Sequence, residues 1–158
     1  MLVKKMAFTK MLDELDKKIL NELIENPRIT YRELARRLGV SVGTVHLRVR
    51  KLQTKGIIKG FTVQIDYGRV GYDVTALVLI KVDGKHIINV ERDVAKYSNV
   101  CAVYDVTGEF DVIVVAKFKS IKELNDFIKS LLAKPYVLST NTSIALNVVK
   151  EDFRLKVP

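Results

Sequence analysis

The sequence predicts an α+β protein that combines an N-terminal helix-turn-helix with a C-terminal ferredoxin-like βαββαβ sandwich domain. Three observations lead to this prediction. Apolar residues recur at helical spacing over residues 12–54, strand-like and helical runs alternate after residue 73, and glycine or proline separates successive runs. With 158 residues, 48% of them apolar, the chain can bury a core in each of two small domains.

The first predicted helix covers residues 13–25, where leucine and isoleucine recur at helical spacing, and Pro27 stops it. A second, short helix follows. Thr30 and Glu33 have the spacing of a capping box, in which the threonine caps the helix and the glutamate reaches back to it. Gly39 ends this helix, because glycine accepts the left-handed conformation of the position after the last turn.

A third helix is expected over residues 42–54, with Ser41 as its N-terminal cap. Two helices joined by a three-residue turn that contains glycine match the helix-turn-helix of DNA-binding proteins, although any small helical hairpin has the same pattern. The apolar stripe of the third helix consists of Val42, Val45, Val49 and Leu52.

Positive charge is concentrated in the first part of the chain. Residues 1–67 hold 14 lysine and arginine residues and 7 acids, a net charge of +7, against +9 for the whole chain. Residues 28–59 contain nine basic residues and one acid, Glu33. Such a field attracts a polyanion, and its coincidence with the helical motif favours nucleic acid over a merely solvated basic face.

The exposed side of the third helix is expected to enter the major groove of double-stranded DNA. Thr44, His46 and Arg48 can hydrogen-bond base edges and Leu47 can contact a thymine methyl group, although His46 also fits an ordinary surface histidine. Basic residues around the motif, including Lys59, are expected at phosphates. The candidate DNA contacts are Arg32, Arg36, Arg37, Ser41, Gly43, Thr44, His46, Leu47, Arg48, Arg50, Lys51 and Lys55.

A strand is predicted from the alternation of Phe61, Val63 and Ile65 with polar residues, and a glycine-containing loop follows it. The remaining chain has the βαββαβ order of a split, ferredoxin-like sheet. Its strands are predicted over residues 74–82, 100–107, 111–118 and 138–149, and its helices over residues 86–97 and from Ile121 to the stop at Pro135.

Both of these helices are expected on one face of the sheet, since crossover connections are right-handed. In every predicted strand both alternations are largely apolar, and no further helix remains to cover the second face. That face therefore fits the same sheet of a second chain, or else the N-terminal helices fold back over it. A two-fold dimer would read a pseudo-palindromic operator with half-sites about 34 Å, or a multiple of this, apart.

Several other classes of function find no support in the sequence. One cysteine and two histidines are too few for a metal cluster, and glycine-rich phosphate loops and the serine-hydrolase elbow are missing, so we expect no catalytic residue, metal or cofactor. No apolar run reaches the ~18 residues of a membrane span. The single Cys101 fits a reducing, cytoplasmic setting.

The chain resembles the leucine-responsive regulatory protein (Lrp)/AsnC family of transcription regulators over residues 12–152. The resemblance implies a winged helix-turn-helix, a hinge strand, and a C-terminal domain that dimerises, assembles further into tetramers or octamers, and binds a small amino acid or related metabolite. It rests on the strings LDELDKKIL from Leu12, ELA from Glu33, GVS from Gly39, RVRKL from Arg48, GIIKGF from Gly56 and GEFD from Gly108.

Four divisions of the chain follow from the motifs and the resemblance together. Residues 1–11 are expected to be an N-terminal extension that is either disordered or adds phosphate contacts, and residues 12–60 are the DNA-binding domain. Residues 61–73 are the hinge strand and linker, and residues 74–158 are the effector-binding and oligomerisation domain.

The resemblance also implies an effector site between dimers, at the turn after the second strand of the sheet and at the start of the last strand. Glu109 or Asp111 can bind an ammonium group there and the Gly108 backbone a carboxylate, although the same residues fit a plain hairpin turn with solvated acids. The candidate effector residues are Thr107, Gly108, Glu109, Phe110, Asp111, Thr140 and Thr142.

Two alternatives to a sequence-specific regulator stay open at this point. Some proteins of this architecture resemble sirohaem decarboxylases, which use C-terminal histidines, whereas His86 is the only histidine after His46 in this chain. A nucleoid-associated architectural protein would bind all DNA alike, in contrast to an operator preference of about 10³-fold or more. A membrane role is disfavoured, because no basic helix has a free apolar face.

Overall fold

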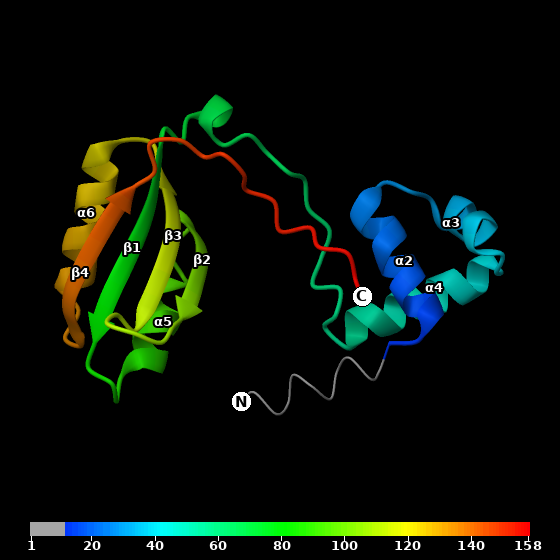
Figure 1. Ribbon diagram of the computed structural model, residues 1–158, viewed down its shortest axis with the longest axis horizontal. Helices are drawn as coiled ribbons and strands as arrows, with labels where there is room; N and C mark the ends of the chain where they lie inside the picture. The colour runs from blue at the N-terminus through cyan, green and yellow to red at the C-terminus, as the bar shows by residue number, and fades with distance from the viewer. Residues whose placement is uncertain (1–11) are drawn as a thin grey trace. The chain divides into compact units, whose positions relative to one another are not determined.

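The computed structural model describes residues 12–158, so the expected N-terminal extension and its phosphate contacts lie outside the described residues. The chain forms two compact units (Figure 1). The first contains residues 12–64 together with Asp152–Pro158, and the second contains Ile65–Glu151. The last seven residues, expected in the effector-binding domain, thus join the first unit, where Val157 packs against the core.

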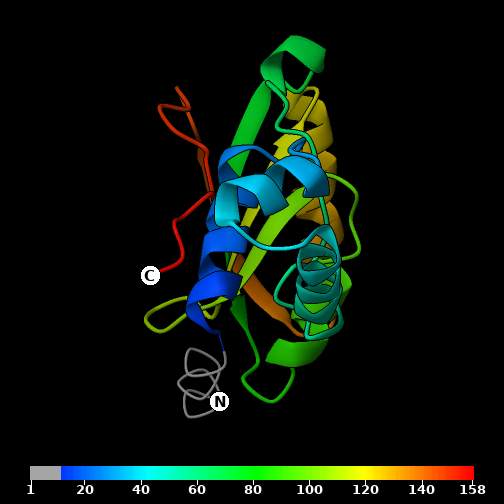
Figure 2. The same cartoon turned by 90° about the vertical axis from the view of Figure 1, so that its right-hand side faces the viewer.

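Three helices make up the first unit, which we call the helical unit (Figure 2). Each helix begins at a side-chain oxygen that accepts a hydrogen bond from the backbone N–H three residues further on, so the caps fix where the helices start. These helices confirm the predicted helix-turn-helix. They are α2 (Glu14–Glu25) after Asp13, α3 (Tyr31–Leu38) after Thr30, and α4 (Val42–Thr54) after Ser41.

The predicted capping box of α3 is only half formed. Thr30 Oγ1 accepts the N–H of Glu33 at 3.1 Å, as expected. The Glu33 carboxylate does not return to the cap but accepts hydrogen bonds from Arg36 and Arg37, because charged donors bind a carboxylate more strongly than a backbone N–H does. Gly39 ends the helix with φ +67°, in agreement with its predicted role.

The three helices enclose one hydrophobic core. Its members come largely from the predicted apolar stripes, except that Val42 is 46% exposed because it lies at the open first turn of α4. Val157 of the C-terminal segment packs against the same core. The buried core residues are Ile19, Leu20, Leu23, Ile29, Leu34, Ala35, Val45, Val49 and Leu52.

Residues 57–66 form no strand, so the strand predicted from Phe61, Val63 and Ile65 is not made among residues 12–158. All three side chains are exposed. A strand needs a neighbour for its backbone hydrogen bonds, and alternation alone does not supply one. No wing hairpin forms among residues 12–64 either, and a single 3₁₀ turn, η1 (Gly68–Val70), precedes the sheet.

The second unit, which we call the sheet unit, is a four-stranded antiparallel sheet with two helices on one face (Figure 1). The strand order β2-β3-β1-β4 confirms the predicted βαββαβ arrangement. No helix in the described part of the chain is long and apolar enough to cross a membrane. The elements are β1 (Val74–Val82), α5 (Ile87–Val94), β2 (Val100–Asp105), β3 (Val112–Phe118), α6 (Ile121–Leu132) and β4 (Val137–Ile144).

Side chains alternate between the helix-covered face of the sheet and the opposite face, which we call the outer face. Val78 and Ile80 of β1 are fully buried beneath the helices. Leu77 and Leu79 project from the outer face, beside their β3 partners Val115 and Ile113. The centre of the outer face is therefore apolar, as predicted.

The last strand is shorter and more polar than predicted. It ends at Ile144 instead of residue 149, because the last backbone bond to β1 runs from the Ala145 N–H to the Thr75 carbonyl at 2.9 Å. The outer face of β4 carries Ser139, Asn141 and Ser143, the partners of Lys81, Leu79 and Leu77. The prediction that every strand is apolar on both sides is wrong for β4.

Candidate nucleic-acid interface and ligand pocket

The outward side of α4 presents basic side chains and one large apolar one. Because the buried valines and leucine of the helix are turned into the core, Leu47 lies opposite them with 67% of its surface exposed. Arg50 and Lys51 are exposed on the same helix. His46 is exposed as well, and its ring and that of Tyr31 form a T-shaped pair with 6.0 Å between the ring centroids. This helix face can reach base edges and phosphates.

The N-terminal cap of α4 involves two of the candidate DNA contacts. Ser41 Oγ accepts the Thr44 N–H at 3.1 Å and lies 2.9 Å from the Thr44 hydroxyl. Each hydroxyl keeps acceptor capacity for a base or phosphate after these bonds. Gly43 between them is exposed, and an added Cβ would meet only Ser41 Oγ at 3.8 Å, so the fold itself does not require glycine there.

Arg48 does not belong to the outward side of α4, so its role at a base edge stays a prediction and its structural partners are acidic. Its guanidinium binds the carboxylates of Asp13 and Asp16, with 3.1 Å between Nη1 and Asp16 Oδ1. The Asp16 side chain is 4% exposed, so Arg48 compensates a buried charge at the start of α2. The cap bond from the Asp16 N–H, and then Arg48, lower the pKa of Asp13.

Arg36 and Arg37 share one acidic partner. Arg36 donates to both Glu33 oxygens, at 2.7 and 2.9 Å. Arg37 donates to Glu33 at 3.0 Å and to Glu22 at 2.9 Å. Both arginines remain exposed, so they can still approach phosphates, but the acids neutralise part of their charge.

Acid is expected to weaken the ion pairs of α3 between about pH 4.5 and pH 2. Hydrogen bonds from Arg36 and Arg37 lower the pKa of Glu33 from 4.5 to about 2 in the folded chain. The stabilisation is therefore complete above pH 4.5 and is lost as the pH falls towards 2 and Glu33 is protonated. An NMR titration of the Glu33 carboxyl carbon measures this, with Glu33→Gln to assign the signal. A midpoint near 4.5 would contradict the ion pairs.

The remaining candidate cations have no ion pair within residues 12–158. Arg32, Arg50, Lys51 and Lys59 are exposed, and Lys55 is half-buried at the end of α4. A cation that neutralises a phosphate releases counterions condensed on the DNA. These residues therefore carry positive charge around α4 that no acid among residues 12–158 neutralises by an ion pair.

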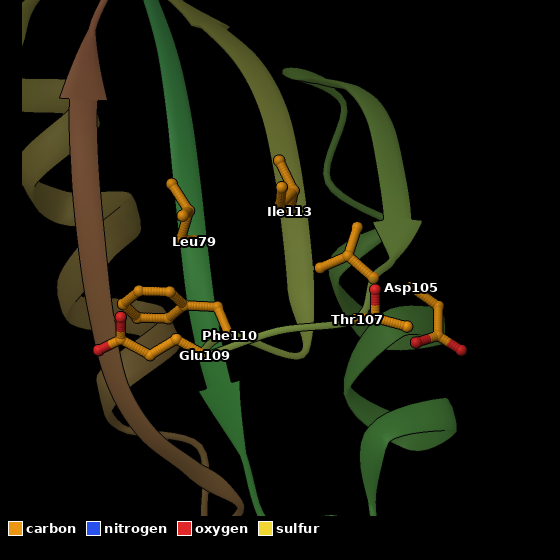
Figure 3. A pocket seen from close by; sticks show the side chains of 7 residues that line it. Leu79, Asp105, Thr107, Glu109, Phe110 and Ile113 are labelled. Carbon is orange, nitrogen blue, oxygen red and sulfur yellow. The ribbon is translucent and has the colours of Figure 1, made fainter.

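A pocket of about 610 Å³ opens on the outer face of the sheet, where β2 and β3 are joined (Figure 3). Leu79 of β1 and Ile113 of β3 form part of its apolar lining, and the carboxylates of Asp105 and Glu109 lie towards opposite ends of the view. None of the backbone N–H groups from Thr107 to Phe110 donates a hydrogen bond within the described residues. The pocket is lined by Leu79, Asp105, Val106, Thr107, Glu109, Phe110 and Ile113.

Asp111 anchors the turn and does not line the pocket, and its place at an ammonium site stays a prediction. Asp111 Oδ2 accepts the Val82 N–H at 2.8 Å, and its carboxylate lies 3.5 Å from Lys81 Nζ. Lys81 Nζ also donates to the Glu109 carbonyl at 2.6 Å. Gly108 holds the turn with φ +124°, a conformation that disfavours other residues.

Thr140 and Thr142 lie away from the pocket. They pair with Ile80 and Val78, whose side chains are buried beneath the helices, and paired residues share a face of the sheet. Neither threonine lines this pocket, and their contribution to an effector site between dimers stays a prediction. Conversely, the prediction missed Leu79, Asp105, Val106 and Ile113, although the alternation in β1 and β3 could have indicated Leu79 and Ile113.

Two family models match the chain. Residues 12–59 match "Winged helix-turn-helix DNA-binding", and residues 75–155, about half of the chain, match "Lrp/AsnC ligand binding domain". The chain belongs to the Lrp/AsnC family. It is therefore a transcriptional regulator with a DNA-binding helix-turn-helix, which confirms the family resemblance and the function class expected from the sequence.

Relatives of this Lrp/AsnC regulator extend over nearly the whole chain. An uncharacterised HTH-type transcriptional regulator of Pyrococcus furiosus is 51% identical over 92% of this chain and 98% of its own length. The HTH-type transcriptional regulator FL11 of Pyrococcus horikoshii is 37% identical over 92% of this chain and 97% of its own. A Neisseria meningitidis transcriptional regulator, solved in complex with L-methionine, has a TM-score of 0.80 at 26% identity and covers 91% of this chain and 96% of its own.

These relatives are named as regulators and give no support to the decarboxylase alternative, which agrees with the expectation that the protein is not an enzyme. The one histidine on which that alternative depended has a packing role. The ring of His86 stacks on Tyr136 with 3.5 Å between ring centroids, next to the start of α5.

Proposed function

We propose that this regulator binds DNA as a homodimer, with α4 of each subunit in the major groove of one half of a pseudo-palindromic operator in the cytoplasmic nucleoid. The observation that carries the proposal is the outward side of α4, where Leu47, Arg50 and Lys51 are exposed on a helix whose other side is buried. Arg32 and Lys55 have no ion pair within residues 12–158 and supply phosphate contacts around it.

Selection of bound sequences from a random DNA pool, with and without mixed amino acids, tests this proposal. We expect enrichment of paired half-sites about one helical turn, or a multiple of it, apart. The affinity for the operator is expected to exceed the affinity for random DNA by about 10³-fold or more. Equal recovery of all sequences would instead favour an architectural, sequence-independent protein.

The homodimer of this proposal forms through the outer faces of two sheet units. Leu77, Leu79, Ile113 and Val115 make an apolar centre on this face, and apolar surface of this kind is stabilised by burial against a partner. The exposed apolar side chains of residues 61–65 supply a further surface for pairing between subunits. Further assembly to tetramers or octamers belongs to the same proposal.

Leu77→Glu is expected to weaken the dimer at least tenfold, because burying a carboxylate against the partner's apolar face costs more than the ~1.4 kcal/mol that a tenfold change represents. Sedimentation equilibrium at micromolar concentration measures the change. Ile88→Glu is the control, since Ile88 is 61% exposed on α5 and lies off the outer face. A wild-type monomer, or an unchanged dimer in both variants, would contradict this interface.

The effector in this proposal is a small amino acid with an apolar side chain, bound at the pocket beside the β2–β3 turn. Leu79, Phe110 and Ile113 suit such a side chain. Glu109 or Asp105 suits the ammonium group, and the backbone N–H groups after Val106 suit the carboxylate. The Neisseria relative, whose ligand is L-methionine, supports an amino acid of this type.

Glu109→Gln is expected to reduce the affinity for the effector about tenfold or more, because the charge-assisted bond to the ammonium group is lost. Calorimetric titration with L-methionine and L-leucine measures this, and DNA affinity without effector should stay unchanged. Asp111→Asn serves as the comparison, since it disturbs the Val82 anchor and should lower the melting temperature instead. Unchanged amino-acid binding by Glu109→Gln would exclude Glu109 from the site.

A further inference from the structure

The chain enters and leaves the sheet unit beside one buried lysine. Lys117 of β3 is 5% exposed and projects on the outer face next to its β1 partner Thr75, whose hydroxyl lies 3.1 Å from Nζ. Lys117 Nζ also lies 2.9 Å from Glu151 Oε2 and 5.4 Å from the ring centre of Tyr67. Tyr67 precedes the first strand and Glu151 follows the last, so Lys117 binds both ends of the unit.

A buried lysine is stable only where its charge is compensated. Glu151 supplies the opposite charge, and the Tyr67 ring adds a cation–π contact. The lysine therefore fixes the position at which the C-terminal segment leaves the sheet unit. Strand pairing does not fix it, because β4 already ends at Ile144.

The far end of the same segment is seated in the helical unit. The Val157 N–H donates to Asn21 Oδ1 at 2.8 Å, and Asn21 Nδ2 donates to the Val157 carbonyl at 3.2 Å. The Val157 side chain packs against the core of the three helices. In both overall views the red end of the chain lies beside α2 (Figures 1 and 2). One amide side chain thus binds both backbone groups of a single residue, as a neighbouring strand would.

We propose that residues 145–158 are a second tether of the DNA-binding helices, held by Lys117 at one end and by Asn21 at the other. Residues 57–66 are the first tether and belong to no helix or strand. A unit held by one flexible segment samples many positions, whereas two attachments reduce that freedom. The effect on DNA rests on the proposed dimeric binding: the second tether narrows the range of half-site spacings that one dimer accepts.

The attachment of Val157 to Asn21 is tested without DNA by amide hydrogen exchange on the full chain. The Val157 N–H is expected to exchange on the order of tenfold more slowly than in an unstructured peptide, and Asn21→Leu should abolish this protection. Asn125→Leu on the exposed side of α6 is the matched control and should leave it unchanged. Unprotected Val157 in the wild type would overturn the proposal.

The function of the tether is tested with selected operators whose half-sites are moved apart by one, two or three base pairs. The wild type should lose about tenfold in affinity at the least favourable spacing, and Asn21→Leu about threefold or less, because a looser unit adapts more easily. Glu151→Gln, which acts at the other end, should have the same effect. Identical spacing profiles in all three proteins would overturn the tether.

The two proposals fail in different ways. A wild type without preference for paired half-sites would overturn the proposed dimeric DNA binding, while the exchange of Val157 would still decide whether the tail is seated. A protected Val157 combined with unchanged spacing profiles would overturn only the second tether.

Discussion

Replacing Leu47 with glutamate is expected to lower operator affinity by about 100-fold. Leu47 is the largest exposed apolar side chain on the outward side of α4, where it can contact a thymine methyl group, and losing the match at one base pair costs about 1–3 kcal/mol. The glutamate removes this contact and adds a negative charge next to phosphates, which repel it. Fluorescence anisotropy with a labelled operator at fixed salt concentration measures the loss.

The fold should not change in this variant, because Leu47 has no part in the core. Leu132→Glu is the matched control: Leu132 is 48% exposed at the end of α6, in the sheet unit, and the same charge change there should leave operator affinity within about twofold. Equal affinity of the Leu47 variant and the wild type would show that the outward side of α4 does not contact DNA.

Arg48→Met is expected to destabilise the helical unit by about 1–3 kcal/mol while leaving the preferred DNA sequence unchanged. The methionine keeps the length of the side chain but leaves the buried Asp16 carboxylate without its cation. The melting temperature should fall by roughly 5 °C or more. Circular dichroism gives the melting temperature, and sequence selection gives the preference.

Two further variants separate a structural role of Arg48 from a role at the DNA. Asp16→Leu added to Arg48→Met should restore much of the stability, because it removes the uncompensated charge. Arg50→Met should weaken DNA binding without a change in melting temperature, since Arg50 is exposed and has no ion pair within residues 12–158. An Arg48→Met protein with normal stability and an altered base preference would show that Arg48 reads DNA.

Local signals predicted most of the secondary structure. The third helix and the first strand of the sheet have their predicted bounds, because Ser41 caps the helix and the strand is a largely apolar segment rich in β-branched residues. Two predictions were wrong for the same reason: the strand at residues 61–65 and the end of the last strand at residue 149. Each has the right alternation, but a strand also needs a partner, which a linear pattern does not reveal.

The structural partners of the candidate site residues could not be predicted, because spacing along one helix says nothing about charges brought there from elsewhere. Arg48 was placed with the DNA contacts by its position in α4, yet its partners Asp13 and Asp16 come from the start of α2. Asp111 was placed in the effector site by the family resemblance, and in the structure its carboxylate accepts the Val82 N–H. In both cases a long-range hydrogen bond supplies a partner that the sequence pattern does not reveal.

The contact between Val157 and the core of the helices has a practical consequence for protein engineering. A regulator with a separate DNA-binding domain is a natural starting point for domain fusion, in which the first 64 residues would be joined to the ligand-binding domain of another protein. Such a chimera would lack the residue that completes the hydrophobic interior beside Asn21. A working graft needs the last seven residues supplied as well, for example by circular permutation that joins them ahead of α2.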